Sequence, residues 1–355
     1  MSRAMRVGTL VAITGFSVAG VSFSEVATAA DGITLSGQIN RAVMFADDGQ
    51  QSKGFFVDNT NSGSRFRMLG TRDVQDGLKA GFLFEVQYQS NPSDAVNFSE
   101  RSVSAEFAER HIDLFLEGGF GTVALGQGNG AANGGMEEDL SGTTVVTYSG
   151  MADFGGGIQF GGDGPAIGDT IGNLDFESRY DRLRYDLPSL GPVGLAASIG
   201  VKGGNDVYEL AARPELKIGS GKLASAIGYS VEKKGGATGD ESTLGFSVSY
   251  LFSSGLNGTL AYATRGTDAP GSEDQTITYL KLGYKTGPHA MSFDYGIAND
   301  FDAAGDDSTA FGVAYVYKAA KWLELYAGGK VHSLDRAGTD VDDITILAVG
   351  SRLKF

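Results

Sequence analysis

The amino-acid sequence predicts an all-β fold: a sixteen-stranded antiparallel β-barrel that crosses a membrane. Three observations support this prediction. Sixteen segments alternate between apolar and polar residues, the connections between them alternate between short and long, and the chain begins with an export signal. Strands that face lipid on one side and water on the other have this alternation. We expect residues 1–30 to be a signal peptide and residues 31–355 to form one transmembrane β-barrel domain.

The composition excludes several classes of protein. The 355 residues include 54 glycines without a collagen period, and 41% hydrophobic residues exclude a disordered acidic chain. A formal net charge of −15 argues against nucleic acid as a partner, because phosphates require a basic surface. The absence of cysteine excludes disulfides and thiol catalysis, and three histidines leave little material for a metal site. We therefore expect no bound metal.

The first thirty residues have the three parts of a secretory signal peptide. Arg3 and Arg6 precede a weakly apolar run over residues 7–23, and small residues follow it. This order predicts export, with cleavage after Ala29 or Ala30. An uncleaved membrane anchor is the alternative, but glycine, serine and threonine interrupt the apolar run. No later stretch has the ~18 consecutive apolar residues of a transmembrane helix.

Residues 78–90 show the alternation with period 2. Leu78, Phe82 and Phe84 lie on one face of the expected strand, and Lys79 and Glu85 lie on the other. Most of the segments have roughly the 9–11 residues that a tilted strand needs to cross a bilayer. The expected strands are 33–46, 64–73, 78–90, 105–117, 120–127, 179–187, 193–202, 206–216, 222–232, 243–252, 257–265, 275–286, 288–298, 308–319, 321–332 and 343–355.

The connections between these strands alternate in length. The short ones are 74–77, 118–119, 188–192, 219–221, 253–256, 287 and 320, and the long ones include 47–63, 91–104, 128–178, 233–242, 266–274, 299–307 and 333–342. Only Gly203-Gly204 is short where a long connection is expected. This arrangement is typical of outer-membrane barrels. A soluble sandwich, propeller or solenoid also has period-2 strands, but it has no reason to alternate its loop lengths, and no repeat of about 20–50 residues is present.

Five short segments carry a family resemblance. The chain ends in an alternating strand with a terminal aromatic residue, Ser351-Arg352-Leu353-Lys354-Phe355. The segments 33–40, 64–73, 117–126 and 183–188 supply further motifs in a fixed order. With these segments, the whole chain after the signal resembles the general (non-specific) porin family of Gram-negative outer membranes.

This resemblance implies a homotrimer of sixteen-stranded barrels in the outer membrane, in contact with lipid and lipopolysaccharide. Each barrel would be a water-filled channel, narrowed by a third loop folded into the lumen, through which small hydrophilic solutes and ions diffuse passively. The resemblance implies no cofactor and no enzymatic activity. The terminal Phe355 implies recognition by the outer-membrane assembly machinery.

The resemblance also implies where the channel is narrowest. The longest connection, 128–178, corresponds to the infolded loop, and its adjacent carboxylates Glu137, Glu138 and Asp139 would face arginines on the barrel wall. Opposed charged walls create a transverse field in a narrow pore. The arginines at matching wall positions are Arg65, Arg110 and Arg184, with Arg67 and Arg72 as neighbours.

Three observations bear on this constriction. Arg110 has the parity of Ile112 and Leu114, so alternation alone turns it outward. The three adjacent acids of the loop also fit a solvated loop tip that does not line the pore. Gln127 stands where family members often carry an arginine. The formal net charge is −15, of which the signal segment carries +1, so the exported chain is more acidic still. We therefore expect weak cation selectivity.

Arg41 is unusual for a wall strand. It has the parity of the outward residues Val43 and Phe45, and a guanidinium facing lipid costs several kcal/mol near the middle of a bilayer. A subunit contact would relieve this cost. A shift in strand register is the other explanation.

Other functions have weaker support in the sequence. The chain has no G-x-S-x-G, H-E-x-x-H or Walker motif, so we expect no catalytic residues. A substrate-selective porin is the main alternative, and a barrel enzyme or an adhesin is less favoured. The many acidic residues of the long loops form either a negative vestibule that binds divalent ions or a solvated surface.

Overall fold

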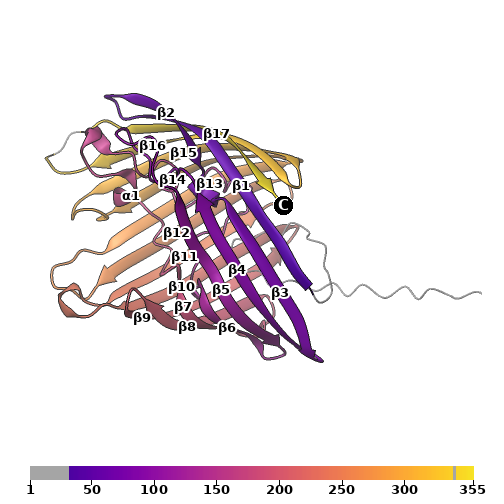
Figure 1. Ribbon diagram of the computed structural model, residues 1–355. Helices are drawn as coiled ribbons and strands as arrows, with labels where there is room; N and C mark the ends of the chain where they lie inside the picture. The colour runs from indigo at the N-terminus through magenta and orange to yellow at the C-terminus, as the bar shows by residue number, and fades with distance from the viewer. Residues whose placement is uncertain (1–31, 339–340) are drawn as a thin grey trace, which may run out of the picture.

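The computed structural model describes residues 32–338 and 341–355, which form one antiparallel sheet of seventeen strands (Figure 1). The expected signal peptide, 1–30, lies outside the described residues. The strands are β1 (Gly32–Asp47), β2 (Ser52–Asp58), β3 (Arg65–Gln75), β4 (Leu78–Gln89), β5 (Glu106–Gly118), β6 (Gly121–Asn129), β7 (Arg179–Asp186), β8 (Val193–Lys202), β9 (Asn205–Ile218), β10 (Gly221–Lys233), β11 (Glu241–Leu251), β12 (Leu256–Thr267), β13 (Gln275–Thr286), β14 (His289–Asn299), β15 (Asp307–Ala320), β16 (Leu323–Asp335) and β17 (Ile344–Lys354).

Within the described ranges, helical structure is confined to short pieces of the connections. They are α1 (Ile167–Thr170) and the 3-10 turns η1 (Thr60–Ser62), η2 (Phe160–Gly162) and η3 (Gly236–Thr238). Among the described residues, no helix has the length and the apolar character to cross a membrane.

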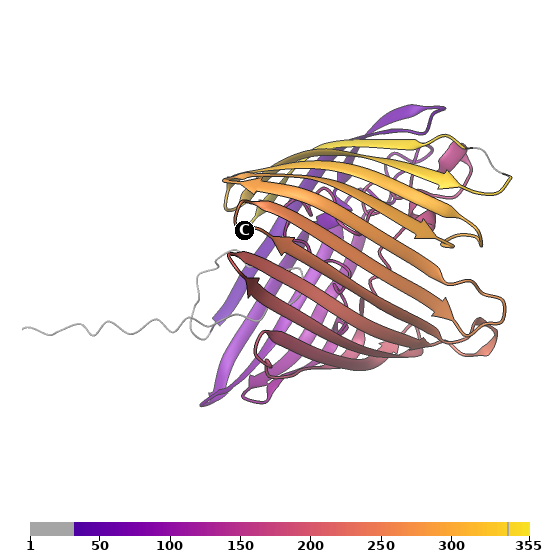
Figure 2. The ribbon, with the colours of Figure 1, turned by 180° about the vertical axis from the view of Figure 1, so that it is seen from behind.

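The sheet closes on itself where the last strand meets the first. β17 pairs with β1 from Gln38 opposite Lys354 to Asp47 opposite Thr345. Two further backbone hydrogen bonds join Phe355 to Gly37, at 2.8 and 3.0 Å. Figures 1 and 2 show the tilted strands of this barrel from its two sides. Closure joins the first and last strands, so that the barrel wall has no terminal strand with an open edge along this seam, as a β-structure in lipid requires.

The sixteen predicted strands are confirmed as β1 and β3 to β17, and β2 is an addition within the connection expected at 47–63. Along one edge of β1, the partner changes. β3 pairs with β1 from Gly32 to Gln38, and β2 pairs with it from Arg41 to Asp47. β2 therefore extends the wall above β3 rather than adding a seventeenth strand around the ring. With seven residues, β2 is too short to be recognised as a strand from its period-2 alternation.

The predicted alternation of connection lengths is also confirmed. The turns between β3 and β4, β5 and β6, and β13 and β14 each span two residues between the strand ends. The long connections lie at the opposite rim, with the expected exception between β8 and β9. In an outer-membrane barrel, the rim with short turns faces the periplasm and the rim with long loops faces the exterior.

The wall strands have two chemically different faces. In β14, the side chains of Met291, Phe293 and Tyr295 are 42%, 61% and 42% exposed, while Ala290 and Ser292 between them are buried. The exposed row is the outer face, because the long connection inside the barrel covers the inner one. An outer surface of large apolar residues is what the hydrocarbon of a bilayer accommodates.

The connection from 130 to 178, between β6 and β7, lies inside the barrel, as expected for the infolded loop. Its apolar side chains, such as Met136 and Phe160, share one core with the inward-facing Ile277 and Ile346 of the wall. We call this segment the lumen loop. Its apolar packing against β12 to β17 covers much of that wall and leaves the arginines of β3 and β5 on the opposite wall uncovered.

Arg41 is stabilised by the strand that the sequence did not reveal. It pairs directly across from Asp58 of β2, with the guanidinium 2.5 Å from the carboxylate, and it donates to Ser90 Oγ at 2.6 Å. The register of β1 with β17 continues without a break past Arg41, so a register shift is not the explanation. An ion pair on the outer face offsets the cost of the cation.

Gly126 provides a test of wall packing. Its φ is +131°, and a Cβ there would lie 2.1 Å from the carbonyl oxygen of Ile112 on the neighbouring strand. We expect Gly126→Ala to destabilise the barrel by more than about 1 kcal/mol, because the backbone conformation and the contact both exclude a side chain. The temperature at which the folded band disappears on SDS gels should fall. Gly258→Ala is the control, since its nearest neighbour is 3.8 Å away; equal melting of the two variants would contradict this account.

Candidate pore constriction

Three arginines surround one glutamate on the inner wall. Glu85 of β4 is 1% exposed, and Arg67 of β3 and Arg110 of β5 each lie 2.5 Å from its carboxylate oxygens. Arg65 of β3 lies 3.7 Å from the same carboxylate. One carboxylate therefore interacts with three guanidinium groups, and these four side chains together keep a net positive charge. We call Arg65, Arg67, Arg110 and Glu85 the wall cluster.

A β-bulge turns Arg110 into the lumen. Glu85 pairs with His111, but the next residue of β4, Val86, pairs with Glu109, so that Arg110 has no partner on β4. A bulge inserts one residue and reverses the parity of everything beyond it. Arg110 and His111 consequently both point inward, while Ile112 is 49% exposed on the outer face. This explains how an arginine with outward parity reaches the wall cluster.

The wall cluster is in contact with water. The side chains of Arg65, Arg67 and Arg110 are 21%, 15% and 18% exposed although they point into the barrel. On the opposite wall, the inward-facing Tyr279 and Ile277 are covered by the lumen loop and are 1% and 0% exposed. The aqueous part of the lumen therefore includes the space beside β3 to β5.

Arg179 links the wall cluster to the lumen loop. It is the first residue of β7, and it interacts electrostatically with Arg110 and Glu85 on one side and with Glu137 and Asp175 of the loop on the other. Within the described residues its guanidinium takes part in no ion pair, and its Nε has no hydrogen-bond partner. Arg179 cannot be recognised as a site residue from the sequence pattern, because it stands at a strand end where parity assigns no face.

The three adjacent acids of the loop, Glu137, Glu138 and Asp139, have different neighbours in the structure. Asp139 forms an ion pair of 2.8 Å with Lys281 of β13, and both side chains are almost fully buried. Glu138 lies near Arg213, Glu215 and Lys222. Only Glu137 interacts with Arg179. The predicted role of all three acids in lining the pore stays a prediction, and the structure brings Glu137 alone toward the wall cluster.

Glu137 lies in an acidic environment. It is half-buried and accepts a hydrogen bond from Asn173 at 3.1 Å. Burial, together with the charges of Asp175 and Asp153, raises the pKa of Glu137 to about 8. The loop side of the constriction therefore carries less negative charge near neutral pH than its sequence suggests.

Three arginines hold the start of the lumen loop by its carbonyl groups. Arg182 donates to the carbonyl of Asn129 at 2.8 Å, and Arg184 donates to that of Gly130 at 2.9 Å. Arg213 donates to the carbonyls of residues 131 to 133, at 2.7 to 3.2 Å. Arg184, predicted to line the constriction, is thus engaged with the loop backbone and with Asp186, at 2.7 Å. Its contribution to the pore surface stays a prediction.

Two carboxylates hold the backbone amides of the same loop. Glu209 of β9 accepts from Ala132 N at 2.8 Å and from Glu177 N at 3.1 Å, which joins the two ends of the loop. Asp175 accepts from Gly134 N and Met136 N, at 2.5 and 2.9 Å. Side chains thereby satisfy backbone groups that have left the sheet.

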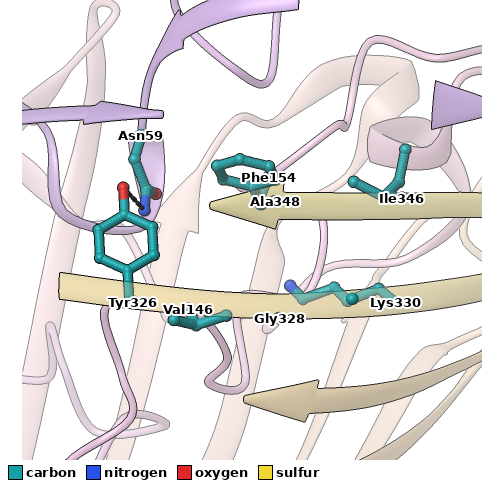
Figure 3. Close-up of a pocket in the computed structure, with 9 residues that line it drawn as sticks. Asn59, Val146, Phe154, Tyr326, Gly328, Lys330, Ile346 and Ala348 are labelled. Carbon is teal, nitrogen blue, oxygen red and sulfur yellow. Dashed lines mark hydrogen bonds between the residues drawn. The ribbon is translucent and has the colours of Figure 1, made fainter. Parts of the chain in front are cut away.

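The middle of the lumen loop is fixed to the opposite wall. Lys281 donates to the carbonyl of Thr147 and Lys330 to that of Met151, both at 2.7 Å. Figure 3 shows Lys330 with Val146 and Tyr326 around a cavity of about 10 Å³ between the loop and β16. That volume holds roughly one water molecule. The loop is therefore packed against this wall without room for a solute.

Among the residues that the structure describes, one cluster of acids has the spacing of a metal site. The carboxylates of Glu177, Glu232 and Glu241 come within 4.8 Å of one another. Lysines already neutralise this cluster: Lys202 lies 2.9 Å from Glu177, and Lys234 lies 2.9 Å from Glu241. We therefore assign no metal to it.

The closed barrel, its apolar exterior and the charged, wet side of its lumen define an outer-membrane channel. The chain matches the Gram-negative porin family over residues 12–336, and it belongs to that family. Members of this family are channels of the outer membrane and not enzymes. The expectations of a porin, of this location and of no enzymatic activity are confirmed by the family match.

Individual relatives are distant in sequence and similar in fold. The chain is 24% identical over 324 residues to outer membrane porin protein 32 of Delftia acidovorans, covering 87% of this chain and 86% of that protein. The anion-selective porin from Comamonas acidovorans superimposes with a TM-score of 0.67 at 18% identity, covering 91% and 99% of the two chains. The trimer form of OmpT from Vibrio cholerae gives 0.60 at 14% identity, covering 91% and 99%.

Glu209 provides a test of loop anchoring. Glu209→Ala leaves two buried amide donors without partners, which costs about 1–3 kcal/mol for each donor. We expect the lumen loop to move, so that single-channel recordings in planar bilayers show larger and more frequent current fluctuations than wild type. Glu215→Ala on the same strand is the control, because Glu215 forms only an exposed pair of 3.0 Å with Lys222. Equally quiet channels in both variants would show that Glu209 does not anchor the loop.

Proposed function

We propose that the chain forms a water-filled channel for passive diffusion of small hydrophilic solutes and ions, with a constriction between the wall cluster and the lumen loop that weakly favours anions. The observation that carries this proposal is the imbalance of charge at the constriction. Arg65, Arg67, Arg110 and Arg179 outnumber Glu85 on the wall. On the loop side, Arg179 faces Asp175 and Glu137, and the pKa of Glu137 is raised, so that the cations remain in excess.

This proposal differs from the weak cation selectivity expected from the sequence. That expectation used the net charge of the chain and placed three acids together at the narrowest point. In the structure, Lys281 neutralises Asp139, and Glu138 lies beside Arg213 and Lys222. A charge acts on a passing ion mainly within about a Debye length, so that the acids of distant loops count for less than the constriction. The anion-selective porin among the structural relatives supports the same direction.

The proposal extends to assembly. We infer a homotrimer, supported by the trimer form of the structural relative OmpT. We also infer that Phe355 is recognised by the outer-membrane assembly machinery. Its ring is 58% exposed at the periplasmic end of β17, where an assembly factor can reach it.

Removing two arginines tests the selectivity. Arg65→Gln with Arg179→Gln leaves Glu85 its two partners at 2.5 Å, so that the wall keeps its structure while the constriction loses two positive charges. We expect the reversal potential in a salt gradient to move toward cation preference. The shift should be largest at low ionic strength, because screening shortens to about 3 Å at 1 M salt.

The matched control removes two exposed arginines elsewhere. Arg72→Gln with Arg101→Gln changes the net charge by the same amount, outside the wall cluster. We expect it to leave the reversal potential close to wild type. Equal shifts in the two double variants would mean that overall charge, and not the constriction, sets the selectivity.

The titration of Glu137 gives a second test. Below its pKa of about 8 this carboxyl is neutral, and as the pH rises through that value it gains a negative charge opposite Arg179. Anion preference should therefore decrease as the pH rises, and Glu137→Gln should abolish that change. Asp163→Asn, an exposed position in the same loop, should retain it. A pH profile that Glu137→Gln leaves intact would remove Glu137 from the constriction.

A further inference from the structure

Two leucines point into the lumen beside the wall cluster. Leu69 of β3 and Leu83 of β4 lie opposite each other in the strand register. They stand two residues from the opposed pair Arg67 and Glu85, toward the short turns. Side chains two residues apart on a strand share a face. Because Arg67 and Glu85 meet in the lumen, the two leucines also face the lumen, on its periplasmic side.

Phe115 of β5 completes this apolar group. It pairs with Gly81, which is the next inward residue of β4 after Leu83. A Cβ on Gly81 would lie 2.3 Å from Cζ of Phe115, so the aromatic ring lies over the glycine on the inner face of the wall. We call Leu69, Leu83 and Phe115 the apolar patch.

The apolar patch lies outside the core that the lumen loop covers. Its three side chains are half-buried, and none of them belongs to the apolar core that the loop shares with the wall. On the opposite wall, Ile277 and Tyr279 also point inward, but the loop buries them. Apolar surface that stays in contact with water favours the binding of other apolar surface, because burial removes both from water.

The apolar patch and the wall cluster are adjacent. Leu69 stands two residues from Arg67, which is about 7 Å along a strand at ~3.4 Å per residue. The wall cluster keeps an excess of positive charge, and the guanidinium of Arg67, which donates to Glu85 through Nε, has five N–H donors in all. A carboxylate can therefore bind the wall cluster while an apolar group attached to it lies on the patch.

We propose that the constriction favours small monocarboxylates with an apolar body, such as aromatic acids, over hydrophilic anions of the same charge. The carboxylate of the solute binds the arginines of the wall cluster, and its ring packs against the apolar patch. This inference rests on the proposed function, because it requires anions to enter the constriction. It adds a contact that distinguishes anions by their apolar surface and not by their charge.

Block of the chloride current by two carboxylates tests this preference. Single channels of the whole protein in planar bilayers are titrated at neutral pH with benzoate, which has a ring, and with gluconate, which has a hydroxylated chain in its place. We expect the half-blocking concentration of benzoate to be about tenfold lower than that of gluconate. That ratio corresponds to the burial of roughly 50–60 Å² of apolar surface.

Two double variants separate the apolar contact from the charge. Leu69→Asn with Leu83→Asn replaces two apolar side chains by polar ones of similar size. It should bring the half-blocking concentration of benzoate to that of gluconate, while gluconate block stays at the wild-type level. Arg65→Gln with Arg179→Gln should weaken block by both acids to the same extent, because both carry one carboxylate.

Two further variants guard against an effect of altered folding. Thr71 is the next inward residue of β3 and pairs with Gly81, so Thr71→Val enlarges the apolar patch without changing its shape. It should lower the half-blocking concentration of benzoate by about threefold. Val74→Asn with Leu190→Asn makes the same polar change at two exposed positions of the periplasmic rim, and it should leave block by both acids at the wild-type level.

The outcomes distinguish this inference from the proposed function. Equal block by benzoate and gluconate in wild-type channels that prefer anions would overturn the inference and leave the proposed function intact. Channels without anion preference would overturn the proposed function, and the inference with it. Benzoate preference that survives in the variant with Leu69→Asn and Leu83→Asn would place the ring elsewhere and overturn the inference alone.

Discussion

The constraint on which the structure depends is that no backbone amide or carbonyl can stay unpaired in hydrocarbon. The sheet meets it by closing, with β17 hydrogen-bonded to β1 and Phe355 to Gly37 at the seam. Closure fixes the two faces of every strand, one toward lipid and one toward the lumen. Polar side chains collect in the lumen, where they are available to bind whatever enters it.

The lumen loop meets the same constraint by other means. Between residues 130 and 178 the chain leaves the sheet, so that its amides and carbonyls need new partners in the interior. Arginines of β7 and β9 donate hydrogen bonds to the carbonyls at its start, and Glu209 accepts from amides at both ends. Lys281 and Lys330 donate to carbonyls in its middle. These contacts, together with apolar packing, hold the loop to one wall and leave the arginine-rich wall facing water.

The sequence was sufficient for most of the fold because lipid imposes a period on strands. Sixteen wall strands and the alternating connections follow from that period. The period says nothing about β2, which is too short, or about the bulge at Arg110, which shifts parity by one residue. The loop has no period either, so that the divergence of Glu137 from Asp139 is not visible in the sequence. The partner of Asp139 is 142 residues away.

The wall holds the lumen loop mainly by its backbone, and this has a consequence for variation. Carbonyl and amide groups are the same at every residue, so that the anchoring contacts specify the path of the loop and not the identity of its side chains. Mutations at exposed loop positions can therefore alter the chemistry of the passage while its course is preserved. The glycines are the exception: a Cβ on Gly130 would lie 2.0 Å from the Glu209 carboxylate. The path of the lumen loop and the solute preference of the channel can therefore change independently in evolution.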